Sequence, residues 1–188
     1  MYKYSIREIS KDEALNMVRK YHYSNTLPKI NRYYMGFFLD GEIVGVMTLG
    51  LGTRPLHTIK RIFPSLGTDD YLEIGRMCMT EEMPRNSESQ MISQLIKWLK
   101  ANHPEIKILF TWADGMLGKV GYVYQASNFI YAGYSGGEMY MKGGTKIHVR
   151  QMKSFLIPGG GKGRTDNRQT NTGTDETIRH QTLQGKAV

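Results

Sequence analysis

The residues best suited to chemistry follow an apolar run at residues 106–112. An acid, two phenols and an amide lie close together there, separated by glycines: Asp114, Tyr122, Tyr124 and Gln125. In an open α/β sheet, catalytic groups gather where a buried strand ends. Asp114 is therefore a candidate acid–base residue, although an aspartate at such a turn could instead cap the next helix.

His22 and Tyr23 are further candidates, at the end of an amphipathic helix that leads toward Pro28. Two interpretations are open. They could be a histidine near the negative end of the helix dipole and a tyrosine of the core. Alternatively, they could form the polar edge of a substrate pocket.

Arg76 follows Glu73 by three residues within an apolar segment, residues 71–79, that is expected to be a strand. If both side chains face the same way, they break the alternation of the strand and need polar partners. Arg76 then either pairs with Glu73 or presents its planar fork to a phosphate or carboxylate.

The elements that would position these residues alternate along the chain. Strands are expected at residues 2–9, 33–39, 43–49, 71–79, 106–112, 130–141 and 146–155, with a tight Asp40-Gly41 hairpin turn. Helices are expected to begin at the capping boxes Ser10/Glu13 and Ser87/Gln90, the second ending at His103-Pro104, with a short third helix near 119–128. This order resembles the acyl-CoA N-acetyltransferase (GNAT) fold. The expected class is thus α/β (α+β), with a central mixed, mostly antiparallel sheet flanked by helices.

Composition predicts one catalytic domain at residues 1–157 and a flexible polar tail at 158–188. The tail has too few apolar residues to offset the entropy cost of ordering it. The tail holds five Lys or Arg and three Asp or Glu, so six of the eight net positive charges lie in the domain. A basic, tyrosine-rich surface suits a nucleic-acid partner. The single cysteine and the absence of a membrane-length apolar run indicate a soluble cytoplasmic protein.

A donor site is expected at Asn86, Ser87 and Ser89, where a GNAT protein binds the pyrophosphate of its cofactor. The free N–H groups of a helix N-terminus favour anions at this position. However, a GNAT loop is typically glycine-rich and basic, and no glycine lies between Gly75 and Gly115. This difference disfavours ordinary CoA binding.

Four ordered blocks of the sequence resemble the Mom family of bacteriophage DNA-modification proteins. They are Tyr21-His22-Tyr23-Ser24, Leu72-Glu73-Ile74-Gly75-Arg76, Asn86-Ser87-Glu88-Ser89, and Ala113-Asp114-Gly115 followed by Val120-Gly121-Tyr122-Val123-Tyr124-Gln125-Ala126 and Tyr131-Ala132-Gly133. The resemblance covers residues 15–135. Residues 116–119 and the tail depart from the family pattern.

The resemblance implies transfer of a small carbonyl-containing group, of the methylcarbamoyl type, to N6 of adenine in double-stranded DNA, which would block host restriction enzymes. It implies that Asp114 is the base or amine orienter and Tyr124 the acid, while Arg76 holds a phosphate or the donor. The protein would act in the cytoplasm of an infected bacterium.

The same resemblance implies that His22 and Tyr23 complete the pocket for the base, and that Ser89, with Asn86 and Ser87, binds the anionic part of the donor. Acetyl-CoA or a related donor is one cofactor candidate. Iron is another, because His22, Tyr23 and Asp114 form a set of imidazole, phenol and carboxylate groups. Two alternatives stay open: a conventional GNAT N-acetyltransferase acting on a small amine or a protein, and a non-catalytic DNA-binding protein.

Overall fold

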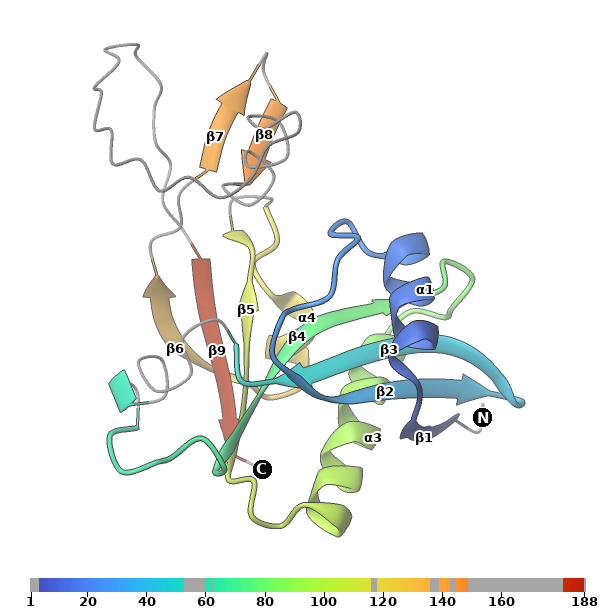
Figure 1. Cartoon of the computed structure of the whole chain (residues 1–188), viewed down its shortest axis with the longest axis horizontal. Coiled ribbons are helices and arrows are strands. Elements are labelled where there is room, and N and C mark those ends of the chain that lie inside the picture. The colour runs from blue at the N-terminus through green and yellow to red at the C-terminus, as the bar shows by residue number, and fades with distance from the viewer. Residues whose placement is uncertain are drawn as a thin grey trace, which may run out of the picture.

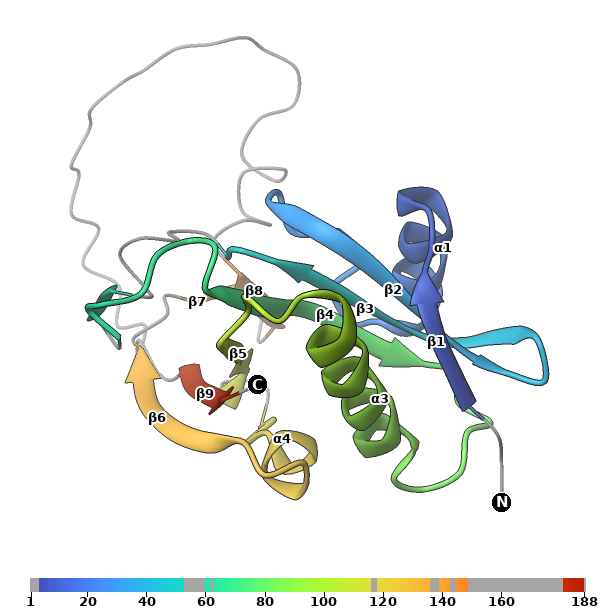
Figure 2. The same cartoon turned by 90° about the horizontal axis from the view of Figure 1, so that it is seen from below.

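A mixed sheet with a helix on each face forms the centre of the computed structural model (Figures 1 and 2). The structure describes residues 4–52, 60–61, 63–115, 118–135, 139–142, 145–148 and 181–187, with side chains as far as residue 133. Within these ranges, the large sheet has seven strands in the order β1-β2-β3-β4-β5-β9-β6, and β7 and β8 form a separate hairpin. The prediction of a mixed, mostly antiparallel sheet flanked by helices is confirmed.

The first elements form as local sequence signals predict. They are β1 (Tyr4–Glu8), α1 (Lys11–Tyr21), β2 (Asn31–Leu39) and β3 (Glu42–Gly50). The capping box at the start of α1 is present, since Ser10 Oγ accepts from Glu13 N at 3.2 Å and the Glu13 carboxylate accepts from Ser10 N at 2.8 Å. Asp40 and Gly41 both have positive φ, 51° and 91°, as a tight hairpin turn between twisted strands requires.

Strand β4 (Tyr71–Met79) carries a bulge at Gly75, because Thr48 of β3 pairs with Arg76 while the next residue, Leu49, pairs with Ile74. The extra residue shifts the alternation of side chains. Leu72 and Ile74 before the bulge, and Met77 and Met79 after it, contact the same core cluster. The bulge therefore places Arg76 on the same face of the sheet as Glu73.

Helix α3 (Ser87–Asn102) buries one stripe of side chains against the sheet: Met91, Ile92, Leu95 and Leu99. The predicted capping box at its start is wrong. Asn86 is the N-cap residue, in a left-handed conformation with φ of 72°, and it makes no side-chain capping bond. Ser87 is instead the first residue within the helix, and its hydroxyl donates to the Pro84 carbonyl oxygen at 2.7 Å. The predicted end of the helix at His103 is confirmed.

The remaining elements are β5 (Ile108–Ala113), α4 (Tyr122–Ala126), β6 (Ile130–Ser135), β7 (Met139–Lys142), β8 (Thr145–His148) and β9 (Gln181–Ala187). The two strands expected at 130–141 and 146–155 are thus shorter and form three separate strands, with residues 149–155 outside the described residues.

Strand β9 lies within the segment predicted to be a flexible tail, and it pairs antiparallel with both β5 and β6. The structure corrects the prediction for residues 181–187, while residues 158–180 lie outside the described residues. A polar strand can enter a sheet because backbone N–H and C=O groups, rather than side chains, form the ladder. The prediction considered only the apolar side chains of the segment and so did not anticipate a strand held by backbone hydrogen bonds.

Candidate active site

The candidate site lies where β4 and β5 separate. These strands pair in parallel only from Tyr71↔Ile108 to Ile74↔Thr111, just before the bulge, and they diverge beyond it (Figure 1). Thr111 marks the point of separation, since its buried hydroxyl donates to the Ile74 carbonyl oxygen at 3.1 Å. Beyond this point no backbone hydrogen bonds join the described strands β4 and β5, so polar side chains can occupy the space between the two strands.

Asp114 follows β5 directly, as predicted, and is partly exposed. Its carbonyl oxygen accepts from Lys119 N at 3.1 Å, which closes the turn to α4. Gly118 and Gly121 have φ of 71° and 77°, a conformation that glycine adopts without strain. The glycine spacing noted in the sequence therefore serves to fold this turn back toward the site.

Tyr124 lies on α4 and is partly buried. Its ring packs against Phe129, with centroids 5.5 Å apart, and its carbonyl oxygen accepts from Phe129 N at 2.9 Å. Burial raises the pKa of the Tyr124 phenol, the neighbouring Tyr23 adds to the increase, and a hydrogen bond with the Thr111 side chain opposes it. The phenol is therefore protonated at neutral pH and can donate a proton.

His22 is the C-cap residue of α1, and its ring stacks on Tyr23 with centroids 4.3 Å apart. The Nδ1 atom lies 2.9 Å from the donating Ser24 N and 3.0 Å from Ser24 O. Burial lowers the pKa of His22 to about 4, and the positive charges of Arg76 and Lys119 contribute to the decrease. His22 is thus a helix-terminal histidine, as one interpretation expected, but its imidazole is uncharged at neutral pH and so gains no charge interaction with the helix dipole.

Tyr23 is 57% exposed, so it is not the core tyrosine of the alternative interpretation. The Lys119 ammonium lies 4.3 Å from the centroid of its ring. Partial burial raises the pKa of the Tyr23 phenol, the negative charge of Asp114 adds to the increase, and Arg76 opposes it. The structure thus brings Tyr23 and His22 together with Arg76, and places Tyr23 within the electrostatic influence of both Asp114 and Tyr124.

Arg76 uses its guanidinium for the loop that follows α1. Nε donates to Thr26 O at 2.9 Å and Nη2 to Ser24 Oγ at 3.1 Å, while Nη1 donates to Gly75 O at 2.7 Å. These three bonds go to protein oxygens other than the Glu73 carboxylate. Glu73 accepts from Trp112 Nε1 at 3.3 Å.

The candidate donor residues lie at the start of α3. Asn86 is exposed and Ser89 partly exposed, but Ser87 is fully buried, with its hydroxyl 3.4 Å from the Tyr4 hydroxyl. Asn86 takes a backbone conformation usual for glycine, in a loop that contains no glycine. The first turn of α3 has no side-chain cap, which suits an anion, although the glycine-rich cradle typical of CoA-binding loops is absent.

Within the described residues, no group of three His, Cys, Asp or Glu side chains could hold a metal ion. The His22, Tyr23 and Asp114 set includes a phenol, and two observations on His22 suit a metal ligand. The imidazole of His22 is uncharged, and Ser24 holds Nδ1, which leaves Nε2 as the nitrogen that faces away from this backbone contact.

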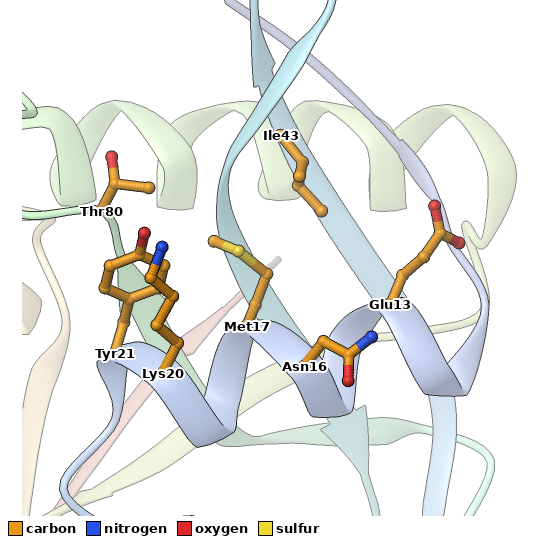
Figure 3. Close-up of a pocket in the computed structure, with 7 residues that line it drawn as sticks. All are labelled: Glu13, Asn16, Met17, Lys20, Tyr21, Ile43 and Thr80. Atoms are coloured by element: carbon orange, nitrogen blue, oxygen red, sulfur yellow. The ribbon is translucent and has the colours of Figure 1, made fainter.

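A hollow of about 280 Å³ lies between α1 and the sheet, beside Ile43 of β3 and Thr80 after β4, and is lined by none of these residues. Figure 3 shows Met17 and Ile43 at its centre, between Glu13 and Asn16 at one end and Lys20, Tyr21 and Thr80 at the other. Its lining includes a carboxylate and a phenol, Glu13 and Tyr21, but the Glu13 carboxylate already accepts hydrogen bonds from Ser10 in the capping box of α1. We therefore place the candidate active site at the β4–β5 separation.

Sequence reasoning missed Lys119, Ser24 and Thr111. Lys119 belongs to the part of the turn that departs from the family pattern, and its neighbours in sequence gave no sign that it would reach Tyr23. The roles of Ser24 and Thr111 depend on contacts between segments far apart in the chain. Only the fold brings these segments together.

The fold defines the class of protein. An acetyltransferase of the GNAT family from Streptococcus pneumoniae has a TM-score of 0.52 to this chain at 15% identity, covering 99% of this chain and 100% of that one. The IAA acetyltransferase from Bacillus cereus gives a TM-score of 0.52 at 12% identity, with the same coverage. The chain therefore has a GNAT acetyltransferase-like fold.

Sequence comparison gives the family. Residues 3–187 match the model of the Mom protein family, and the chain belongs to this family. It is 31% identical over 142 residues to the methylcarbamoylase Mom of Escherichia phage Mu. The match covers 76% of this chain and spans 58% of the length of the phage Mu protein. Among the described residues, no helix is long and apolar enough to cross a membrane.

Proposed function

We propose that this protein is a transferase that places a small carbonyl-containing group, of the methylcarbamoyl type, on N6 of adenine in double-stranded DNA and so protects phage DNA from restriction. The observation that carries the proposal is that Asp114 and Tyr124 lie on the turn and helix that follow β5 beyond its separation from β4, with Tyr23 near enough to interact electrostatically with both, in a chain of the Mom family. The name of the phage Mu relative, methylcarbamoylase, supports the type of group transferred.

The chemistry assigns a task to each residue. The lone pair of an adenine amine is delocalised into the ring, so the amine becomes an effective nucleophile only if a proton leaves as the new N–C bond forms. The Asp114 carboxylate accepts that proton from N6. As the bond between the donor carbonyl and its leaving group breaks, the protonated Tyr124 phenol gives its proton to the leaving group.

A DNA substrate suits the surface around the site. Adenine must leave the duplex stack before N6 can enter a protein pocket, and aromatic side chains stabilise an unstacked base. Tyr23 and Tyr122 are 57% and 77% exposed, and the exposed Lys119 lies beside Tyr23. The chain also carries a formal charge of +8, which attracts the phosphate backbone.

Two cofactors fit parts of the site. The uncapped start of α3, with Asn86 and Ser89, would hold the anionic part of an acyl donor such as acetyl-CoA or a related compound. Iron would be held by His22, Tyr23 and Asp114, where it would polarise a bound carbonyl. In that case Asp114 would be a ligand, so the base role assigned to it above belongs to the site without iron.

The decisive experiment is mass spectrometry of nucleosides from the DNA of bacteria that express the protein. We expect a deoxyadenosine derivative of increased mass, absent from cells that express Asp114→Asn. The same DNA should resist restriction enzymes whose sites contain adenine. Unmodified deoxyadenosine in cells with abundant folded protein would refute the proposal. Turnover of a free amine with acetyl-CoA would instead identify a conventional N-acetyltransferase.

A further inference from the structure

The segment between α1 and β2, residues 22–30, crosses the sheet and carries His22 and Tyr23; we call it the strap. Two glycines allow it to lie directly on the sheet. A Cβ on Gly75 would lie 2.6 Å from Pro28 Cγ, and a Cβ on Gly50 would overlap the Ile30 carbonyl oxygen. Side chains at either position would therefore push the strap away from β3 and β4.

Hydrogen bonds hold the strap at both ends. Near its start, Arg76 donates to Thr26 O and Ser24 Oγ, at 2.9 and 3.1 Å. Near its end, Asn31 Nδ2 donates to Pro28 O at 2.6 Å, and Leu51 N donates to Ile30 O at 3.3 Å. The bulge at Gly75 turns Arg76 to the face of the sheet that the strap covers.

The strap also positions the site. Ser24 connects the two parts, because its hydroxyl accepts from Arg76 while its backbone contacts His22 Nδ1. The His22 ring in turn stacks on Tyr23. A displacement of Ser24 is therefore transmitted to both rings, and Tyr23 is the ring within the electrostatic influence of Asp114 and Tyr124.

We propose that Arg76 is a positioning residue: it seats the strap on β4, with Gly75 providing the space, and thereby fixes Tyr23 over the site, rather than acting chiefly as a fork for phosphate. The role assigned to Tyr23 rests on the proposed function, whereas the seating of the strap does not. At least three of the five N–H groups of the guanidinium already bind protein oxygens. A lysine has the charge but cannot reproduce this geometry.

Gly75→Ala separates the two roles, because it moves the strap while leaving the Arg76 charge in place. If Arg76 positions the strap, Gly75→Ala, Arg76→Lys and Arg76→Gln should all reduce DNA modification, by about a hundredfold for a displacement of about 1 Å. None should weaken binding to a short labelled DNA duplex. If Arg76 is a phosphate fork, Arg76→Gln should weaken that binding and reduce its salt dependence by one phosphate, and Gly75→Ala should change nothing.

Two matched controls exclude general effects. In Gly67→Ala, the added Cβ would lie no closer than 3.5 Å to any atom outside the adjacent residues. Arg32→Gln removes a positive charge from an exposed ion pair with Asp69. Both controls should keep the parent rate. Adding Pro28→Ala to Gly75→Ala removes the clashing Cγ and should restore part of the lost activity, which a simple failure to fold would not allow.

NMR of ¹³C-labelled histidine tests the seating without any activity. In Gly75→Ala and Arg76→Lys, the His22 signals should shift, because Ser24 and the Tyr23 ring, which contact the imidazole, move with the strap. This result would stand even if the parent modified no DNA. Unchanged His22 signals in Gly75→Ala, together with parent-level modification, would overturn the proposal.

Discussion

Asp114 and Tyr124 lie at the two ends of one turn, and their surroundings differ. Asp114 follows a buried strand and remains partly exposed, whereas Tyr124 is packed against Phe129. Burial raises the pKa of Tyr124, so the acid is ready in its protonated form. This difference in surroundings is consistent with the roles of base and acid proposed for the two residues.

Asp114→Asn and Tyr124→Phe remove a proton acceptor and a proton donor with little change in shape. We expect each to abolish adenine modification, while the melting temperature shifts by a few degrees at most and the affinity for duplex DNA stays the same. Nucleoside mass spectrometry, thermal unfolding and DNA titration measure the three properties. Parent-level modification by both variants would show that neither residue handles a proton.

His22 makes stability depend on pH. Its pKa is about 4 in the folded protein, below the value of about 6.5 expected when unfolded, so the unfolded chain binds more protons between these values. The stabilisation is complete above pH 6.5 and is lost as the pH falls through 4. Urea unfolding across this range should show a smaller loss of stability in His22→Gln than in the parent. Equal pH dependence in the two proteins would place His22 in a solvated setting.

Among the helices and strands, features set by residues close together in the chain could be predicted from the sequence, whereas features set by contacts between distant segments could not. The Ser10/Glu13 cap and the Asp40-Gly41 turn were predictable because each depends on residues a few positions apart. The bulge at Gly75 was not, since it appears only when β4 is aligned with β3. The same holds for the candidate site: Asp114 and Tyr124 were found from one local turn, whereas the bonds from Arg76 to the strap span 50 or 52 positions.

Helix α4 presents one tyrosine to each side. Tyr124 packs inward against Phe129, while Tyr122, two positions earlier, is 77% exposed. If Tyr122 stacks against bases when adenine leaves the duplex, Tyr122→Ala should reduce modification of duplex DNA more than that of single-stranded DNA, in which no base pair must open. Tyr122→Phe, which keeps the ring, and Tyr131→Ala on β6 should behave like the parent. An equal loss on both substrates would exclude this role.

For the whole molecule, β9 changes what the C-terminal region is expected to do. In the described sheet, β6 joins β5 only through β9, which pairs with Ile108–Ala113 on one side and with Ile130–Ser135 on the other. A truncation that appeared harmless from composition would thus open the sheet next to α4.

We therefore expect deletion of residues 181–188 to lower the melting temperature and to reduce modification. Without β9, β6 has no strand to pair with in the described sheet, and the end of α4, which leads into β6, is no longer anchored to the sheet. Thermal unfolding of the truncated and full-length proteins tests this expectation. A matched substitution of Thr182 or Gln184 by alanine keeps the backbone ladder and should have a much smaller effect. Unchanged stability after the deletion would restore the view of this segment as a dispensable tail.

The position of β9 also affects the order in which the protein can assemble during translation. Because β9 follows β6 in the chain but lies between β5 and β6 in the sheet, β6 leaves the ribosome well before the strand that attaches it. Until then, β5 presents an unpaired edge, which other nascent chains can join. The turn with Asp114 and the helix with Tyr124 connect β5 to β6, so the sheet holds the candidate site in place only after β9 has joined both strands. Slow synthesis of the region between β6 and β9 would therefore lengthen the period in which the exposed edge of β5 can aggregate.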